Sequence, residues 1–284
     1  MYCLESYIKN NLDILYVEPT KANRSIDYRK TIDYWFSFGP VISIQSDRPY
    51  FRGDNIDIFN ELVKTTQRDN WSCEIQNIFG LLESKSFLDK YKTLDDFAEQ
   101  GTYNLINDIS LSQLDKILRH FGLQDSEKYR ITTGSFLCCL WDERVFFSRH
   151  DGSHHFAAAR FIASRIAKEV MLYGSVSFKY INTIAATYII NKYHIFLMKI
   201  EYKTWNNMHS LLDAAKIPYY FCEYRSASCY AVILPVDDKK TMVLSKILSN
   251  LGFFFLNSSL KEILANQSTI MGKLGIQHDI LQNQ

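Results

Sequence analysis

Apolar and polar positions follow two different spacings along this chain. Apolar residues spaced three or four apart are typical of helices, and short alternating or continuous apolar runs between turn residues are typical of strands. Helices are predicted at 55–66, 92–100, 157–170, 205–216, 239–251 and 260–266, and another carries Leu114, Ile117, Leu118 and Phe121. Strands are predicted at 41–44, 71–79, 135–141, 144–148, 175–180, 194–201, 219–224, 230–236 and 253–256. Together these elements predict an α+β protein.

Polar residues at two of the helix starts support these predictions. Thr93 is followed three residues later by Asp96, which is the spacing of a capping box. Ser110 or Ser112 can cap the next helix, and Gly122 follows its last apolar residue, where helices commonly end.

The last third of the chain has a regular order of its own. From 194 to 256 the predicted elements run strand, helix, strand, strand, helix, strand, which is the ferredoxin-like βαββαβ order. We therefore divide the chain into an N-terminal mixed α/β region at 1–100, a central domain at 101–188 and a ferredoxin-like module at 189–284. Tyrosines and phenylalanines on the sheet of such a module either pack in its core or stack bases.

Composition narrows the class of protein. The chain has 284 residues, of which 47% are hydrophobic and 22% charged, with a net charge of +1. This is the make-up of a globular protein without a global basic field for nucleic acid. The first residues lack the pattern of a secretory signal, and no run approaches the ~18 apolar residues of a membrane span. The six cysteines include no Cys-x-x-Cys pair, so we expect reduced, buried thiols in a cytoplasmic protein, and no zinc, haem or flavin.

Candidate chemistry concentrates in the segment from Arg149 to Arg160, which reads Arg-His-Asp-Gly-Ser-His-His-Phe-Ala-Ala-Ala-Arg. Two predicted strands precede this segment, and a predicted helix follows its Asp-Gly turn. The first N–H groups of a helix lack intrahelical acceptors and the helix dipole is positive there, so this order of elements favours an anion site. Arg149, His154 and His155 can add charge-assisted donors to a bound phosphate.

The stretch 109–166 resembles the ParB/sulfiredoxin-like superfamily. Members of that superfamily carry a helix, a pair of strands and then the motif DG-x-H-R-x-x-A-A at the start of another helix. Asp151, Gly152 and His154 match this motif, as do Ala158 and Ala159. The resemblance implies a ParB/sulfiredoxin-like core that handles nucleotides or nucleic acid.

Two positions depart from the family pattern. His155 stands where the family usually has an arginine that contacts phosphate, and histidine replaces it as a weaker, pH-dependent cation. Arg149 or Arg160 can compensate from either side. Ser153 stands where sulfiredoxins have a cysteine, which argues against sulfinic-acid reductase activity.

The resemblance implies an enzyme that binds a nucleotide such as ATP, CTP or ADP with Mg²⁺ at the Asp151–His155 turn and transfers or hydrolyses a phosphoryl group. No resident metal is expected. The residues expected to act in catalysis are His154, Asp151 and His155. The residues expected to bind the nucleotide are Arg149, Gly152, Ser153, His154, His155 and Arg160.

Other functions of the same superfamily remain open. One is non-catalytic sensing of a nucleotide or nucleic acid, or partner binding, within a DNA-modification or phage-defence system. Another is a ParB-like nuclease. In any of these roles, the C-terminal module can bind nucleic acid or a protein partner, or form a homodimer, and no membrane association is expected.

Overall fold

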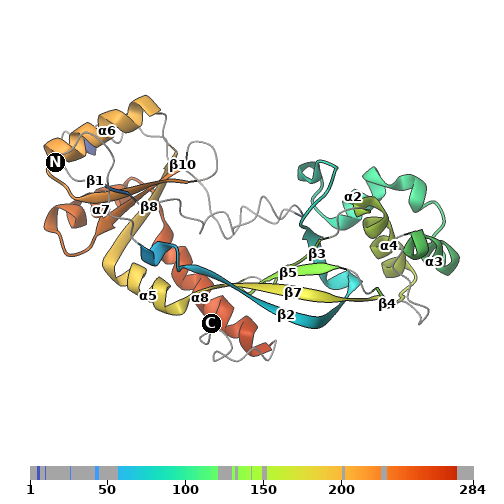
Figure 1. Ribbon diagram of the computed structural model, residues 1–284. Coiled ribbons are helices and arrows are strands. Elements are labelled where there is room, and N and C mark those ends of the chain that lie inside the picture. The colour runs from blue at the N-terminus through green and yellow to red at the C-terminus, as the bar shows by residue number, and fades with distance from the viewer. Residues whose placement is uncertain are drawn as a thin grey trace. The chain divides into compact units, whose positions relative to one another are not determined.

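The computed structural model describes residues 57–120, 130–131, 134–141, 143–148, 152–199, 202–224 and 229–273, together with 5–6, 10, 26 and 42–44. Within these ranges the chain is mixed α/β, with one sheet of six strands and one of five (Figure 1). The predicted α+β class is therefore confirmed. None of the helices in the described ranges is long and apolar enough to cross a lipid bilayer.

The chain forms two compact units. We call the first the central unit; it contains Thr65–Tyr180 and the last turns of the final helix, from Gln267 on. We call the second the C-terminal unit; it contains Ile181–Asn266 and the short strand β1 at Ile42–Ile44. The three consecutive domains expected from the sequence stay a prediction.

The central unit is built on a mixed sheet in the order β2-β7-β5-β6-β3, with β4 paired to β7. β5 and β6 form an antiparallel hairpin, whereas β5 runs parallel to β7 and β3 runs parallel to β6. Its strands are β2 Val63–Glu74, β3 Ile78–Leu81, β4 Arg130–Ile131, β5 Ser135–Cys139, β6 Val145–Ser148 and β7 Met171–Ile181. Its helices are α2 Leu94–Gly101, α3 Leu111–His120 and α4 Ser153–Arg165. Its 3-10 turns are η4 Ile75–Asn77, η5 Leu88–Lys90 and η6 Tyr103–Leu105.

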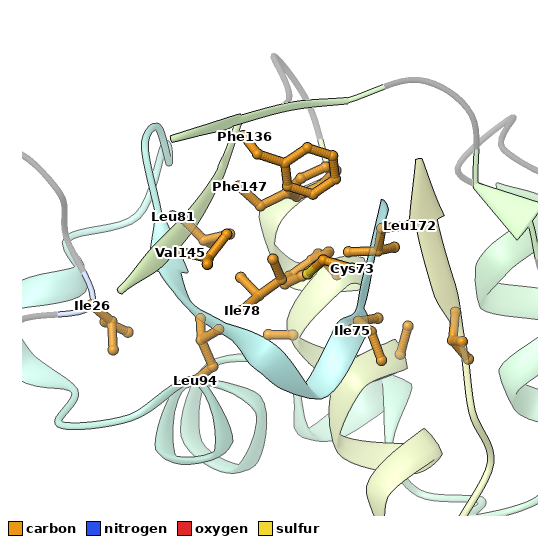
Figure 2. Close-up of a cluster of buried hydrophobic side chains, with 14 of the residues drawn as sticks. Ile26, Cys73, Ile75, Ile78, Leu81, Leu94, Phe136, Val145, Phe147 and Leu172 are labelled. Atoms are coloured by element: carbon orange, nitrogen blue, oxygen red, sulfur yellow. The ribbon is translucent and has the colours of Figure 1, made fainter. Parts of the chain in front are cut away.

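Helix α4 is the centre of packing in this unit, and both α2 and α3 contact it. Its buried side chains include the run Ala157–Ala159, where small residues let neighbouring elements approach closely. Phe156 stacks on Phe147 of β6 at a ring-centroid distance of 4.8 Å. Figure 2 shows Phe147 with Phe136, Val145 and other apolar side chains of this core. The start of α4 is thus fixed by packing on the sheet.

The C-terminal unit has an antiparallel sheet in the order β1-β9-β10-β8-β11. Along the chain its elements run β8-α6-β9-β10-α7-β11, as the hydrophobic pattern predicts. The strands are β8 Tyr193–Lys199, β9 Tyr219–Tyr224, β10 Cys229–Pro235 and β11 Phe254–Phe255. The helices are α5 Thr183–Lys192, α6 Tyr202–Ala214, α7 Lys239–Asn250 and α8 Leu256–Lys273.

Both faces of this sheet are buried. Phe196 and Met198 of β8 belong to a cluster with apolar residues of α6 and α7. The residues between and beside them, Ile195 and Leu197, are buried as well, and side chains that alternate along a strand point to opposite faces. Met208 and Leu212 of α6 and Leu244 and Leu248 of α7 pack together on the face that carries Phe196 and Met198. Tyr219 and Phe221 of β9 are buried and pack in this core.

The local capping predictions are confirmed. The Oγ1 of Thr93 accepts a hydrogen bond from the N–H of Asp96, and the N–H of Thr93 donates to an Oδ2 of Asp96, both at 3.0 Å. The Oγ of Ser110 accepts from the N–H of Gln113 at 3.2 Å. Gly122 lies outside the described residues.

Three helix predictions need correction. The segment 55–66 is not a helix: Asp57–Phe59 forms a 3-10 turn and β2 begins at Val63, because Val63 to Glu74 joins the sheet beside β7. Helix α4 begins at Ser153, four residues earlier than predicted, and ends at Arg165. The last helix spans Leu256–Lys273, longer than the predicted 260–266.

Candidate functional site

A cavity of about 660 Å³ lies in the central unit. Three segments that are far apart in the sequence line it: the loop Glu83–Lys85 after β3, the turn Gly101–Leu105 after α2, and the start of α4 at Gly152–His155. A volume of this size is within the usual range for small-molecule sites. Part of the segment singled out from the sequence, Gly152–His155, therefore forms one wall of a cavity.

Gly152 sets the geometry of the wall made by α4. Its φ of 98° is in the left-handed region, which residues with a Cβ rarely adopt. Its carbonyl oxygen accepts the first intrahelical hydrogen bond, from the N–H of Phe156 at 2.8 Å. As a glycine it provides no side chain to cap the helix, so the first-turn N–H groups of Ser153 and His154 rely on groups outside the helix. The helix dipole makes this end of α4 positive.

Three serine hydroxyls tie the loop after β3 to the start of α4. Ser84 Oγ donates to Ser153 Oγ at 3.1 Å. Ser84 Oγ also accepts from the N–H of Ser86 at 3.1 Å, and Ser86 Oγ is 3.1 Å from Nε2 of His154. The two walls of the cavity are therefore joined by short polar contacts that fix the position of His154.

The ring of His154 is held on two sides. Its Nε2 meets Ser86, and its face lies 5.1 Å from the ring of Phe97 on α2, centroid to centroid. Within the described part of the chain, Nδ1 of His154 has no hydrogen-bond partner. This nitrogen therefore has capacity for a further hydrogen bond while Nε2 keeps its contact to Ser86.

Charged side chains of opposite sign line the cavity. Lys85 and Glu83 are both exposed on the loop after β3. The ammonium group of Lys85 suits an anion. The carboxylate of Glu83 repels an anion unless a divalent cation lies between them, since Mg²⁺ takes carboxylate and phosphate oxygens together.

Arg160, expected from the sequence to bind the nucleotide, has a different environment. Its guanidinium forms an ion pair with Asp95 of α2, and one of its NH₂ groups donates to the carbonyl oxygen of Gln76 at 3.2 Å. The side-chain amide of Gln76 donates in return to the carbonyl oxygen of Arg160 at 2.7 Å. Arg160 is not among the residues that line the cavity.

The structure thus brings together part of the expected site. Gly152, Ser153, His154 and His155 line the cavity, and Arg160 does not. Arg149 and Asp151 lie outside the described residues.

Two walls were not foreseen from the sequence. A signal for the first was present: the polar run from Glu83 to Ser86 directly follows a short buried strand, which is where loops carry ligand-binding groups in many folds. The turn Gly101–Leu105 carries no comparable signal.

Cys73, Cys138, Cys139 and Cys222 are buried thiols. Burial raises the pKa of the Cys73 thiol to about 12, with a further contribution from the charge of Glu74. This thiol therefore stays protonated at neutral pH, which makes it a poor nucleophile.

Comparisons with known proteins bear on the chain as a whole. No curated protein matches it, and no solved structure matches it. One family profile, described as a family of unknown function (DUF6685), matches residues 68–273. This match spans most of the 284 residues and includes the three cavity walls, so the chain belongs to this family of unknown function, DUF6685.

Proposed function

We propose that this protein binds a nucleoside di- or triphosphate with Mg²⁺ in the cavity at the start of α4 and transfers or hydrolyses a phosphoryl group. The observation that carries the proposal is the composition of the cavity wall. The positive end of a 13-residue helix, Ser153, His154, His155 and the cation Lys85 line one space. Phosphate is the common ligand for such a set of backbone and cationic donors.

In this proposal each wall residue has a task. Backbone N–H groups of the first turn of α4 hold phosphate oxygens, and His154 and His155 add donors. Hydrolysis would form a bond from a water oxygen to the terminal phosphorus and break the bond from that phosphorus to the bridging oxygen, which leaves with the shortened nucleotide. A histidine or Asp151 would accept the proton of that water. Arg149 would offset the charge that develops on the transferred group.

Mg²⁺ is part of the proposal because of Glu83. Its carboxylate lines the same cavity as the proposed phosphate donors. If Mg²⁺ binds in this cavity, Glu83 would supply a carboxylate oxygen to hold it, and the charge of the ion would offset the repulsion between that carboxylate and the phosphates. We therefore expect nucleotide binding to depend on Mg²⁺, and we expect Glu83→Gln to reduce that dependence.

We also propose family relations for the two units. A ParB/sulfiredoxin-like core in the central unit is supported by its order of α3, the β5–β6 hairpin and a helix opening at Gly152. A ferredoxin-like module in the C-terminal unit is supported by its βαββαβ order and by the sheet order β11-β8-β10-β9. Binding of nucleic acid or a protein partner, homodimer formation through this module, and a cytoplasmic location follow as proposals.

The test is a thermal-shift and turnover experiment on the full chain. ATP, CTP, GTP, ADP and a short DNA duplex are each added with Mg²⁺, and phosphate release and DNA cleavage are followed in parallel. A ligand at about 100 times its Kd stabilises the folded state by roughly 2.7 kcal/mol, which raises Tm measurably. We expect a nucleotide to raise Tm in the wild type and to lose this effect in His154→Ala.

A lysine pair provides the matched control. Lys85 lines the cavity, whereas Lys90 lies outside its lining, with its Nζ 5.3 Å from the ring centroid of Tyr91. We expect Lys85→Ala to weaken nucleotide binding and Lys90→Ala to leave it unchanged. Binding without phosphate release would favour the non-catalytic sensor, and DNA cleavage would favour the nuclease. Absence of any nucleotide effect on Tm would overturn the proposal.

A further inference from the structure

Tyr103 is an exposed aromatic residue among those that line the cavity. It is 62% exposed. Its aromatic neighbours along the chain, Tyr91 and Phe97, are buried. An exposed aromatic ring beside a cavity offers an apolar face that a ligand can cover.

The turn that carries Tyr103 is held firmly. The hydroxyl of the preceding residue, Thr102, donates to the carbonyl oxygen of Ala98 at 2.7 Å. The N–H of Leu105 donates to the carbonyl oxygen of Thr102 at 2.8 Å, and the carbonyl oxygen of Leu105 accepts from the side-chain amide of Gln113 at 2.8 Å. A backbone fixed on both sides presents its side chain with little loss of entropy on binding.

We infer that Tyr103 is a stacking platform for the base of the nucleotide, so that the ligand of this cavity is a nucleotide and not a simple phosphate or sugar phosphate. This inference rests on the proposed phosphate site at the start of α4. The polar groups of α4 and of the loop after β3 hold the phosphates, and the turn at Tyr103 completes the cavity with an aromatic face. Stacking on an aromatic ring tolerates every base, because each base has a π-face.

The experiment is isothermal titration of the full chain with ADP and, separately, with pyrophosphate, each with Mg²⁺. Tyr103→Ala removes the ring, and Tyr103→Phe keeps the ring and removes the hydroxyl. Phe87→Ala is the matched control, since Phe87 is also exposed, at 82%, but does not line the cavity. Because Tyr103 and Phe87 are both exposed, all three variants should fold, which circular dichroism checks.

We expect Tyr103→Ala to weaken ADP binding by about 5- to 150-fold, the range for one lost base-stacking contact. We expect the same variant to bind pyrophosphate as the wild type does, and Tyr103→Phe and Phe87→Ala to bind ADP within about twofold of the wild type.

The results separate the two proposals. If pyrophosphate binds the wild type, and Tyr103→Ala leaves ADP affinity unchanged or lowers both affinities equally, the stacking role is wrong and the phosphate site stands. If neither ADP nor pyrophosphate binds the wild type, both the phosphate site and the stacking role are overturned.

Discussion

The ion pair between Arg160 and Asp95 should be one of the stronger polar contacts between α4 and α2. Its side chains are 18% and 34% exposed, respectively. Exposed pairs contribute up to about 1 kcal/mol, whereas removing one partner of a buried pair costs roughly 3–5 kcal/mol. This pair lies between those limits. In Asp95→Ala the guanidinium would keep the carbonyl oxygen of Gln76 as a partner, so we expect the free energy of unfolding to fall by about 2 kcal/mol.

The assay is equilibrium urea denaturation of Asp95→Ala, Arg160→Ala and the double variant. The double-mutant cycle should give a coupling free energy of about 1 kcal/mol or more. Glu99→Ala is the control on the same helix, because Glu99 pairs at 3.7 Å with the half-exposed Arg165, which Asp95 also meets at 3.9 Å. We expect that change to cost less than about 0.5 kcal/mol. Equal losses for Asp95→Ala and Glu99→Ala would refute the reasoning from burial.

Three further predictions concern the backbone, the pH and a helix cap. A Cβ at Gly174 would overlap a backbone carbonyl oxygen, so Gly174→Ala should lower the free energy of unfolding by more than about 2 kcal/mol. A Cβ at Gly252 meets open space but the φ there is 82°, so Gly252→Ala should lower it by about 1 kcal/mol. Urea denaturation measures both changes. Burial and a neighbouring lysine lower the pKa of His194 below 6.5. As pH falls, His194 therefore becomes protonated in the unfolded chain at a higher pH than in the folded chain. The free energy of unfolding should therefore fall as pH drops through 6.5, with a smaller fall in His194→Gln. Urea denaturation should show that Thr93→Ala lowers the free energy of unfolding by about 1 kcal/mol and that Thr93→Ser lowers it much less.

The sequence predicts best those features that depend on neighbouring residues. The capping box at Thr93 and the hairpin of β5 and β6 are set by side chains a few positions apart, and both are present. The prediction at 55–66 is wrong because apolar positions there also fit a 3-10 turn followed by a strand. What decides between a helix and β2 is pairing with β7, about a hundred residues later in the chain, and no local pattern contains that information.

The candidate site divides along the same line. Its wall at Gly152–His155 is one continuous segment with a recognisable order of turn and polar donors, so the sequence is enough to find it. The loop at Glu83–Lys85 and the turn at Tyr103 reach the cavity only through the tertiary fold. Arg160 shows that a place in the right segment is not sufficient. It lies on the same helix, but it pairs with Asp95 and does not line the cavity.

The composition of the central core has a consequence for synthesis on the ribosome. Ile270 and Met271 of α8 belong to the core cluster whose other buried members lie between Ile26 and Tyr180. The central unit therefore lacks part of its core until the whole C-terminal unit has been translated. At a synthesis rate of about 5–20 residues per second, the apolar surface that Ile270 and Met271 cover stays exposed for several seconds. Chaperone contact with the nascent chain should accordingly persist until translation has passed Met271.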